Sequence, residues 1–356
     1  MRQPAHGGNL AWAAALAGCP PDAILDFSAS ISPLGPPNSA IAAIKSQIGN
    51  LKHYPDPNYS ELRLALSHFH QVPFEWILPG NGSAELLTLI GRELAQLAAT
   101  ILITPAFGDY YRTLKSYNAK VLECPLSLVI GHWSLVVDKG QKTMDKGLLL
   151  NNPHNPTGKL FSRESILPYL EQFALVVVDE AFMDFVPPNE EQSLIPVVQE
   201  YPNLVVLRSL TKFYSLPGLR LGYAIAHPDC LAKWQLWRDP WPVNTLAAAA
   251  AIAALQDTEF QQQTWAWLPP ARNQLFQGLA EIPGLQPQAS AANFLLVESQ
   301  ESTSELQQQL LKYHQILIRD CLSFKELGDR FFRVAVREES DNQRLLTALN
   351  SVLSGQ

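Results

Sequence analysis

Short, wholly apolar runs recur through the middle of the chain, and each is about as long as a buried strand. The runs at 175–178 and 204–207 are continuously apolar, which is typical of a parallel sheet covered on both faces. Strands are predicted at 76–78, 100–104, 121–124, 147–150, 175–178 and 204–207, and helices at 38–50, 60–70, 84–98 and from 162–165 onward. Because strands and helices alternate between residues 75 and 225, the pattern predicts an α/β fold with a mostly parallel sheet and helices on both faces.

The pattern changes after residue 245. An alanine-rich buried helix at 245–255 precedes a long bridging helix at 258–282. The remainder predicts a smaller α+β lobe, with strands at 294–297, 316–319 and 331–336 and helices at 302–313 and 340–353. Residues 127–144 remain ambiguous.

The first 40 residues are rich in turn formers. Gly35 and the prolines around it deny regular structure, so this segment is predicted as an extended arm or loop. The expected organisation is an N-terminal arm at 1–40 that belongs with the small domain, a large domain at 41–245, and a small C-terminal domain at 246–356 that includes the bridging helix.

Composition narrows the function classes. The chain is 47% hydrophobic with a net charge of −7, which favours a sizeable core and argues against nucleic acid as a partner. Four scattered cysteines show no metal-ligand spacing, so we expect no metal site and a reducing compartment. No apolar run is long enough to cross a bilayer and the N-terminus does not read as a signal peptide, so we expect a cytoplasmic protein without membrane contact.

Lys212 is the strongest candidate for chemistry. It follows the strand at 204–207, where desolvation lowers the pKa of an amine and makes it nucleophilic toward an aldehyde. Ser209, Thr211 and Arg220 lie close by in sequence and could together hold a phosphate. Pyridoxal phosphate has an aldehyde and a phosphate. A lysine that reacts with the aldehyde and a nearby group of residues that binds the phosphate would therefore suit this cofactor. The alternative is a surface lysine, with Arg220 in an ion pair.

Other candidates lie at the ends of predicted strands. The glycine-rich turn at 79–85 leads into a helix whose N-terminus could bind an anion, although it is neither a P-loop nor a dinucleotide fingerprint. Asp179 ends a buried strand, where open α/β sheets bind ligands, or else caps a helix. Asn155 could donate to a phenolate-like oxygen. Tyr110 could stack on a flat ring, or form part of a helix's buried face.

The C-terminal lobe carries Arg319, Arg333 and Arg337. The last two are four residues apart on a predicted strand and should face the same side. Such a pair favours a substrate with both a carboxylate and a phosphate. The alternative is surface ion pairing with Glu338 or Glu339.

Together these motifs resemble the fold type I superfamily of pyridoxal-phosphate-dependent aminotransferases. The matching elements are Asn155-Pro156-x-Gly158, Asp179-Glu180-Ala181, Ser209-x-x-Lys212 and Arg220-x-Gly222, in that order. Within the superfamily, Tyr54-Pro55-Asp56-Pro57 and residues 218–223 resemble histidinol-phosphate aminotransferases. Residues 6–9, 26–36, 179–182, 209–214 and 333–337 resemble more closely the L-threonine-O-3-phosphate decarboxylases of cobalamin biosynthesis.

The resemblance implies a role for each candidate. Lys212 would form the Schiff base and move protons, Asp179 would pair with the ring nitrogen, Asn155 would bond the ring oxygen, and Tyr110 would stack on the ring. The residues implied to hold the cofactor phosphate are Ser83, Ala84, Ser209, Thr211 and Arg220, together with Tyr54 from the partner subunit of a homodimer. The residues implied to bind substrate are Arg333 on its carboxylate, His6, Arg319 and Arg337 around its phosphate, and Gly7, Ser30 and Asn155.

The implied reaction is decarboxylation of L-threonine O-3-phosphate to (R)-1-amino-2-propanol O-2-phosphate. One alternative is an aminotransferase acting on histidinol phosphate or an aromatic amino acid, and another is a non-catalytic protein of the same fold. Phe182 stands where histidinol-phosphate aminotransferases usually carry tyrosine. This departure favours the decarboxylase.

Overall fold

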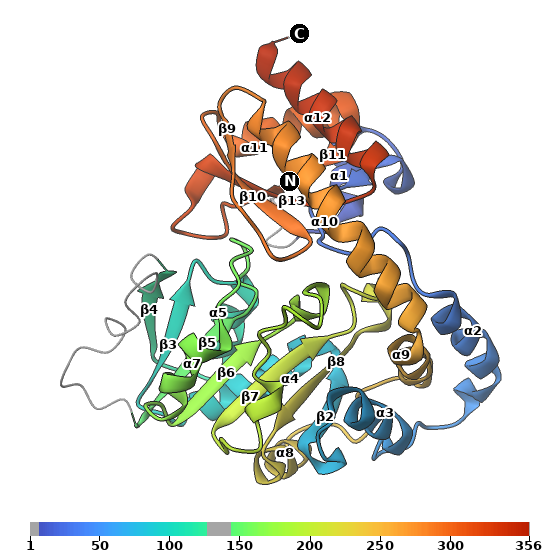
Figure 1. Ribbon diagram of the computed structural model, residues 1–356, viewed down its shortest axis with the longest axis vertical. Helices are drawn as coiled ribbons and strands as arrows, with labels where there is room; N and C mark the ends of the chain where they lie inside the picture. The colour runs from blue at the N-terminus through green and yellow to red at the C-terminus, as the bar shows by residue number, and fades with distance from the viewer. Residues whose placement is uncertain (1–6, 127–143, 356) are drawn as a thin grey trace.

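The computed structural model describes residues 7–126 and 144–355. In Figure 1 a large sheet with its helices forms one part of the molecule, and a smaller sheet with the chain's last helices forms the other. The long helix α10 (Thr258–Ala280) runs between the two parts. Almost all of the ambiguous segment 127–144 lies outside the described residues.

The large sheet has seven strands in the order β2-β8-β7-β6-β5-β3-β4. Strands β4, β3, β5, β6 and β7 are parallel to one another, while β8 runs antiparallel to both β7 and β2. The predicted mostly parallel sheet is therefore confirmed. The strands are β2 (Ile77–Asn81), β3 (Ala99–Thr104), β4 (Val121–Pro125), β5 (Lys146–Asn151), β6 (Leu175–Asp179), β7 (Leu204–Ser209) and β8 (Leu221–Ala226).

Two apolar clusters cover the two faces of this sheet. Val177 of β6 packs on one face among residues of α4, α5 and α8, and Val176 and Val178 pack on the other among residues of α3, α7 and α9. Burial on both faces explains why these strands read as unbroken apolar runs. The helices are α2 (Asn38–Gln47), α3 (Ser60–His70), α4 (Gly82–Leu94), α5 (Gly108–Ser116), α7 (Arg163–Leu170), α8 (Pro228–Gln235) and α9 (Thr245–Gln256).

The turn predicted at 79–85 is partly strand. Pro79 and Gly80 continue β2 to Asn81, and α4 begins directly at Gly82. Proline is tolerated here because β2 is the edge strand of the sheet, where a missing N–H leaves no partner unsatisfied. The helix N-terminus is thus placed directly at the end of a strand.

The smaller sheet is antiparallel, in the order β12-β13-β10-β9. The strand predicted at 316–319 divides into β11 (Ile316–Leu317) and β12 (Arg319–Asp320), because only β12 joins this sheet. Strand β13 ends at Ala335, so Arg337 lies beyond it rather than on it. The remaining elements are β9 (Leu285–Pro287), β10 (Phe294–Ser299), β13 (Phe331–Ala335), α11 (Thr303–Gln309) and α12 (Glu339–Ser354).

The sequence analysis predicted an extended arm or loop over the first 40 residues, but part of this segment is helical. Residues Leu10–Ala17 form α1, with the Asn9 side chain accepting from Trp12 N at one end and Gly18 in the left-handed conformation at the other. These two caps satisfy the helix ends. In Figure 1, α1 lies in the same part of the molecule as β11 and α12.

The rest of this arm is attached to both parts of the molecule. Its strand β1 (Leu25–Asp26) pairs in parallel with β11. Ser32 N donates to Lys212 O at 3.0 Å, and Ser215 Oγ donates to Ser32 O at 2.6 Å.

The domain boundaries at residues 41 and 246 stay predictions. No helix among the described residues is long and apolar enough to span a bilayer.

Candidate active site

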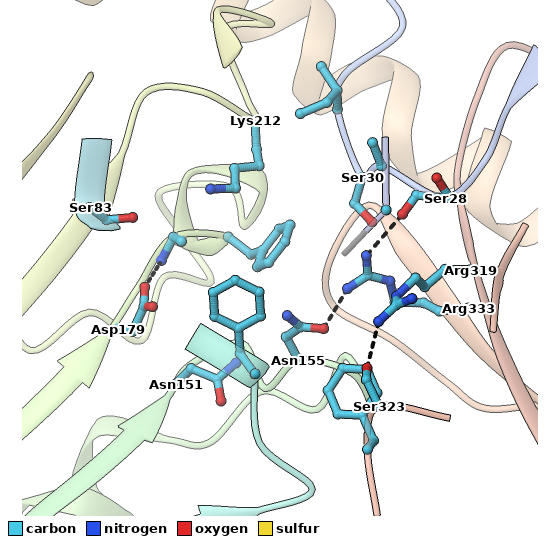
Figure 2. A pocket seen from close by; sticks show the side chains of 18 of the residues that line it. Ser28, Ser30, Ser83, Asn151, Asn155, Asp179, Lys212, Arg319, Ser323 and Arg333 are labelled. Atoms are coloured by element: carbon cyan, nitrogen blue, oxygen red, sulfur yellow. Dashed lines mark hydrogen bonds between the residues drawn. The ribbon is translucent and has the colours of Figure 1, made fainter. Parts of the chain in front are cut away.

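A cavity lies where the carboxyl ends of β5, β6 and β7 face the small sheet and the N-terminal arm. Figure 2 shows Lys212 and Asp179 on one side of it and Arg319 and Arg333 on the other. The parallel strands place their polar end residues at one edge, as the sequence predicted. The cavity therefore has cationic groups at two separate ends.

Lys212 lies in the loop after β7. Its Nζ donates to Ser209 Oγ at 3.0 Å, and Ser209 Oγ also lies 2.8 Å from Thr211 Oγ1. Desolvation by the surrounding protein lowers the pKa of Lys212 to about 8; Arg220 and Arg333 act in the same direction, and Asp179 opposes them. A substantial fraction of this amine is therefore neutral near physiological pH, as a nucleophile requires.

Asp179 is the last residue of β6 and is buried. Its Oδ2 accepts a hydrogen bond of 2.7 Å from the Tyr110 hydroxyl, and its Oδ1 accepts one of 3.0 Å from Ala181 N. Burial raises the pKa of Asp179, whereas the hydroxyl of Tyr110 and the charge of Lys212 lower it. The carboxylate is oriented by donors on both oxygens and still lines the cavity.

The N-terminus of α4 lies against Arg220. A Cβ on Gly82 would come within 2.5 Å of Arg220 Nη2, and a Cβ on Gly222 within 2.6 Å of Ser83 N. Only glycine permits this close approach. Ser83 lines the cavity and Ala84 follows it in the first turn, so an arginine and free helix N–H groups meet at one point.

Arg333 of β13 is buried at the opposite end. Its Nη1 donates to Asn155 Oδ1 at 2.5 Å and its Nη2 to Ser28 O at 3.2 Å, while its Nε has no partner among the described residues. Burial and the nearby charge of Arg319 lower the pKa of Arg333 to about 10. An unpartnered N–H on a buried guanidinium is costly, so this end is suited to a bound anion.

Arg319 and Ser323 form a second donor group beside Arg333. Arg319 Nη2 donates to Ser323 Oγ at 2.5 Å, and both side chains line the cavity. Gly7 and Ser30 also line it, and Ser30 Oγ is buried without a partner among the described residues. Ser323 was missed from the sequence because it lies in an irregular loop without any local motif.

Arg337 and Tyr54, two of the predicted residues that the structure describes, contact other parts of the molecule instead of lining the cavity. Arg337 donates to Asp341 Oδ2 at 2.8 Å and to Asp26 O at 3.3 Å, rather than pairing with Glu338 or Glu339. Tyr54 is exposed and stacks on Trp241, with ring centroids 4.5 Å apart. His6 lies outside the described residues. The substrate roles of Arg337 and His6, and the role of Tyr54 across a subunit interface, stay predictions.

A buried ion cluster, which no sequence motif indicates, lies at the adjoining ends of β6 and β7. Arg208 donates to Glu180 at 2.9 Å, to Asp184 at 2.5 Å and to Glu191 at 2.6 Å, and its side chain is only 1% exposed. Glu180 and Arg208 directly adjoin Asp179 and Ser209 in sequence. The cluster therefore ties together the ends of β6 and β7 that carry the site.

The residues present fit pyridoxal phosphate. The amine of Lys212, whose pKa is lowered, would react with the aldehyde of the cofactor, and the buried carboxylate of Asp179 would pair with its ring nitrogen. Arg220 at the helix N-terminus would bind its phosphate. The unpartnered Nε of Arg333 and Oγ of Ser30 leave polar groups available for a substrate. Among the residues the structure describes, no cluster of His, Cys, Asp and Glu could hold a metal ion.

Comparison with known sequences gives a consistent result. Residues 22–349 match the family described as Aminotransferase class I and II. The chain is 40% identical to a threonine-phosphate decarboxylase from Salmonella typhimurium, over 99% of this chain and 97% of that protein. It is also 33% identical to a histidinol-phosphate aminotransferase from Symbiobacterium thermophilum, over 90% of this chain and 88% of that one.

Solved structures share the fold. The crystal structure of L-threonine-O-3-phosphate decarboxylase from Porphyromonas gingivalis superposes with a TM-score of 0.83 and 25% identity. The superposition covers 92% of this chain and 99% of that one. The similarity thus extends over both sheets.

Proposed function

Because this chain belongs to the aminotransferase class I and II family, we propose that it uses pyridoxal phosphate to decarboxylate L-threonine O-3-phosphate. The product is (R)-1-amino-2-propanol O-2-phosphate, for the aminopropanol arm of cobalamin biosynthesis. One observation supports this substrate above all. Two buried arginines, Arg319 and Arg333, lie across one cavity from Lys212 and suit a small amino acid with two anionic groups.

Pyridoxal phosphate, when bound, supplies an electron-accepting ring that stabilises the charge left on the substrate's α-carbon as a bond breaks. Asp179 would lie at the ring nitrogen and keep it protonated. Ser83 and Arg220 would hold the phosphate of the cofactor. Asn155, whose Oδ1 is occupied by Arg333, is left with its Nδ2 group to donate to the ring oxygen.

The protein's own groups would then select the bond. Arg333 would grip the carboxylate of the substrate and fix its angle to the ring, while Arg319 and Ser323 would hold the distal phosphate. Lys212 would return a proton from its Nζ to the α-carbon after carbon dioxide leaves. Phe182 adds an apolar wall, since its ring lies 6.0 Å from Lys212 Nζ.

The test is a turnover assay with O-phosphothreonine, in which carbon dioxide release is followed while the visible spectrum is recorded. We expect gas release without any added 2-oxo acid. Lys212→Ala should abolish it, and borohydride should fix the cofactor to position 212 only in the unchanged protein. A coloured protein that releases no carbon dioxide from this substrate would overturn the reaction but leave cofactor binding intact.

Transamination is the second candidate, and the similarity to a histidinol-phosphate aminotransferase favours it. It uses the same cofactor site but removes a proton rather than a carboxylate. The two functions separate when histidinol phosphate and 2-oxoglutarate are supplied together. Glutamate formation at a rate above that of decarboxylation would establish the aminotransferase.

We further propose that the protein acts as a cytoplasmic homodimer in which Tyr54 reaches the cofactor phosphate of the partner subunit. Tyr54 is 80% exposed, and Ile48 and Leu51, which precede it closely in the chain, are also exposed. Such an apolar surface is suited to a second copy. Tyr54→Ala and Lys212→Ala proteins, each impaired alone, should regain activity when mixed, because hybrid dimers contain one intact site. A monomer in sedimentation measurements would overturn this proposal.

A further inference from the structure

We propose that Tyr110 is a positioning residue whose hydroxyl fixes the Asp179 carboxylate and keeps the shared proton on the cofactor's ring nitrogen. The inference rests on the proposed cofactor. It goes beyond the stacking role implied for Tyr110, because it concerns the hydroxyl and not the face of the ring. The feature that carries it is the 2.7 Å hydrogen bond from Tyr110 to Asp179 Oδ2.

The geometry of this bond is tightly determined. Tyr110 is 1% exposed, and its ring meets Phe107 edge to face at a centroid distance of 5.6 Å. It belongs to the first turn of α5, where its backbone N–H donates to Phe107 O at 3.0 Å. The phenol can therefore reach Asp179 without any rearrangement of helix or side chain, and few alternative rotamers are open to it.

The two oxygens of Asp179 are held by different elements. Ala181 N, from the chain just after β6, donates to Oδ1, and Tyr110, from α5, donates to Oδ2. An ionised carboxylate accepts up to about four hydrogen bonds, so each oxygen retains capacity for one further donor. A protonated ring nitrogen in the cavity can take that place while both existing bonds remain.

The hydroxyl also sets the basicity of the carboxylate. Burial raises the pKa of Tyr110 well above its ordinary value, so the phenol is a donor throughout the working pH range. A donor on the carboxylate stabilises its charge and weakens it as a base. The other charged groups facing this pair are Lys212, which acts in the same direction, and Asp109, which opposes it. With the phenol present, a proton shared with the ring nitrogen is held on the ring.

A purely apolar role for Tyr110 makes a different prediction. If only the ring matters, through its contacts in the cluster with Leu86 and Leu114, phenylalanine should replace tyrosine without consequence. Tyr111, the next residue on α5, offers a matched control because it also carries a hydroxyl but does not line the cavity. Its hydroxyl bonds to Glu123 instead.

The experiment compares Tyr110→Phe, Tyr110→Ala and Tyr111→Phe with the unchanged protein. Apoprotein is titrated with pyridoxal phosphate to give a dissociation constant, and the visible absorbance of the loaded protein is titrated with pH. Loss of one hydrogen bond to a charged group should weaken cofactor binding about tenfold in Tyr110→Phe. The pKa read from the absorbance should rise by about one unit, since a less charged ring nitrogen withdraws less from the attached amine.

Tyr111→Phe should match the unchanged protein in both measurements, and Tyr110→Ala should be weaker than Tyr110→Phe because the ring is lost as well. If Tyr110→Phe cannot be told from Tyr111→Phe, the inference is wrong and the residue serves by its ring alone. If the unchanged protein gains no visible absorbance with pyridoxal phosphate, the proposed cofactor fails instead. Far-ultraviolet circular dichroism of each variant confirms that it is folded.

Discussion

Asn155 Oδ1 accepts a hydrogen bond of 2.5 Å from Nη1 of Arg333, although the two residues are 178 positions apart. Asn155 lies in the loop after β5 of the large sheet, and Arg333 lies on β13 of the small sheet. The bond fixes both groups in the orientation that the proposed reaction needs. The amide group of Asn155 turns its NH₂ away from the arginine, and no carboxylate among the described residues forms an ion pair with the guanidinium. The cofactor end and the anion end of the cavity are thus physically linked.

Arg333→Lys should raise the KM for O-phosphothreonine by about ten- to a hundredfold, because lysine cannot bond the substrate carboxylate and Asn155 at once. The measurement is initial-rate kinetics of carbon dioxide release. Arg337→Lys is the comparison, since Arg337 bonds Asp341 and Asp26 outside the cavity lining. An equal rise in KM for both variants would show that Arg337 also binds substrate.

Cofactor uptake by the apoprotein should speed up as pH rises and reach half its maximum near pH 8, the pKa of Lys212. The sign follows because only the neutral amine attacks an aldehyde, and desolvation shifts the amine toward that form. Stopped-flow absorbance provides the rates. Asp179→Asn should move the midpoint to lower pH, since the carboxylate raises the pKa of Lys212. A midpoint near that of an ordinary lysine would contradict the argument.

Gly222→Ala should weaken cofactor binding by at least about tenfold, because its Cβ would lie 2.6 Å from Ser83 N and 2.9 Å from Arg208 O. Both are backbone atoms, so the clash with Ser83 N is relieved only if the N-terminus of α4 moves away from β8. Gly218→Ala is the control: no described atom lies within 4 Å of its added Cβ. Equal dissociation constants for the two variants would mean that the helix end does not hold the cofactor.

Ser323→Ala should raise KM for O-phosphothreonine about tenfold while leaving kcat within about twofold, because a hydrogen bond that orients Arg319 is lost. Ser323→Thr, which keeps the hydroxyl, should recover most of the loss. Kinetics with unphosphorylated threonine provides the second measurement. If both amino acids are affected to the same extent, Ser323 does not act on the phosphate.

Arg208→Met should lower the free energy of unfolding by about 3–5 kcal/mol, since it leaves Glu180 and Asp184 buried without their cation. Urea denaturation of the apoprotein measures this quantity. Lys325→Met breaks an ion pair with Glu123 in which lysine is 71% exposed, and should cost less than about 1 kcal/mol. A similar decrease in the free energy of unfolding in both variants would show that the buried Arg208 cluster stabilises the fold no more than an exposed ion pair does.

Much of the large sheet could be predicted because its strands are continuous apolar runs bounded by turn formers. The strand predicted at 175–178 is β6, and the helix predicted at 60–70 is α3. Helix α1 was missed because glycine and proline dominate the surrounding segment. Its signal was present all the same, in Asn9 and Gly18 on either side of eight helix-forming residues.

The site residues that lie at the ends of predicted strands could be identified from the sequence. Those that are placed by contacts between residues far apart in the sequence could not. Lys212, Asp179 and Asn155 follow buried strands, so sheet topology alone brings them together. Ser323 enters the cavity from a loop whose path is set by packing of Phe324, which no local pattern reveals. The Arg208 cluster depends on carboxylates 17 to 28 residues away and escaped notice for the same reason.

Residues 28–32 of the N-terminal arm bond to Arg333 at one end and to the backbone of Lys212 at the other. For protein engineering, these five positions form one short segment between the amine of Lys212 and the guanidinium of Arg333. A library of substitutions confined to these positions would vary the size of the substrates that the cavity accepts, without changing the residues of either sheet. Altered selectivity could then be sought without first rebuilding the scaffold.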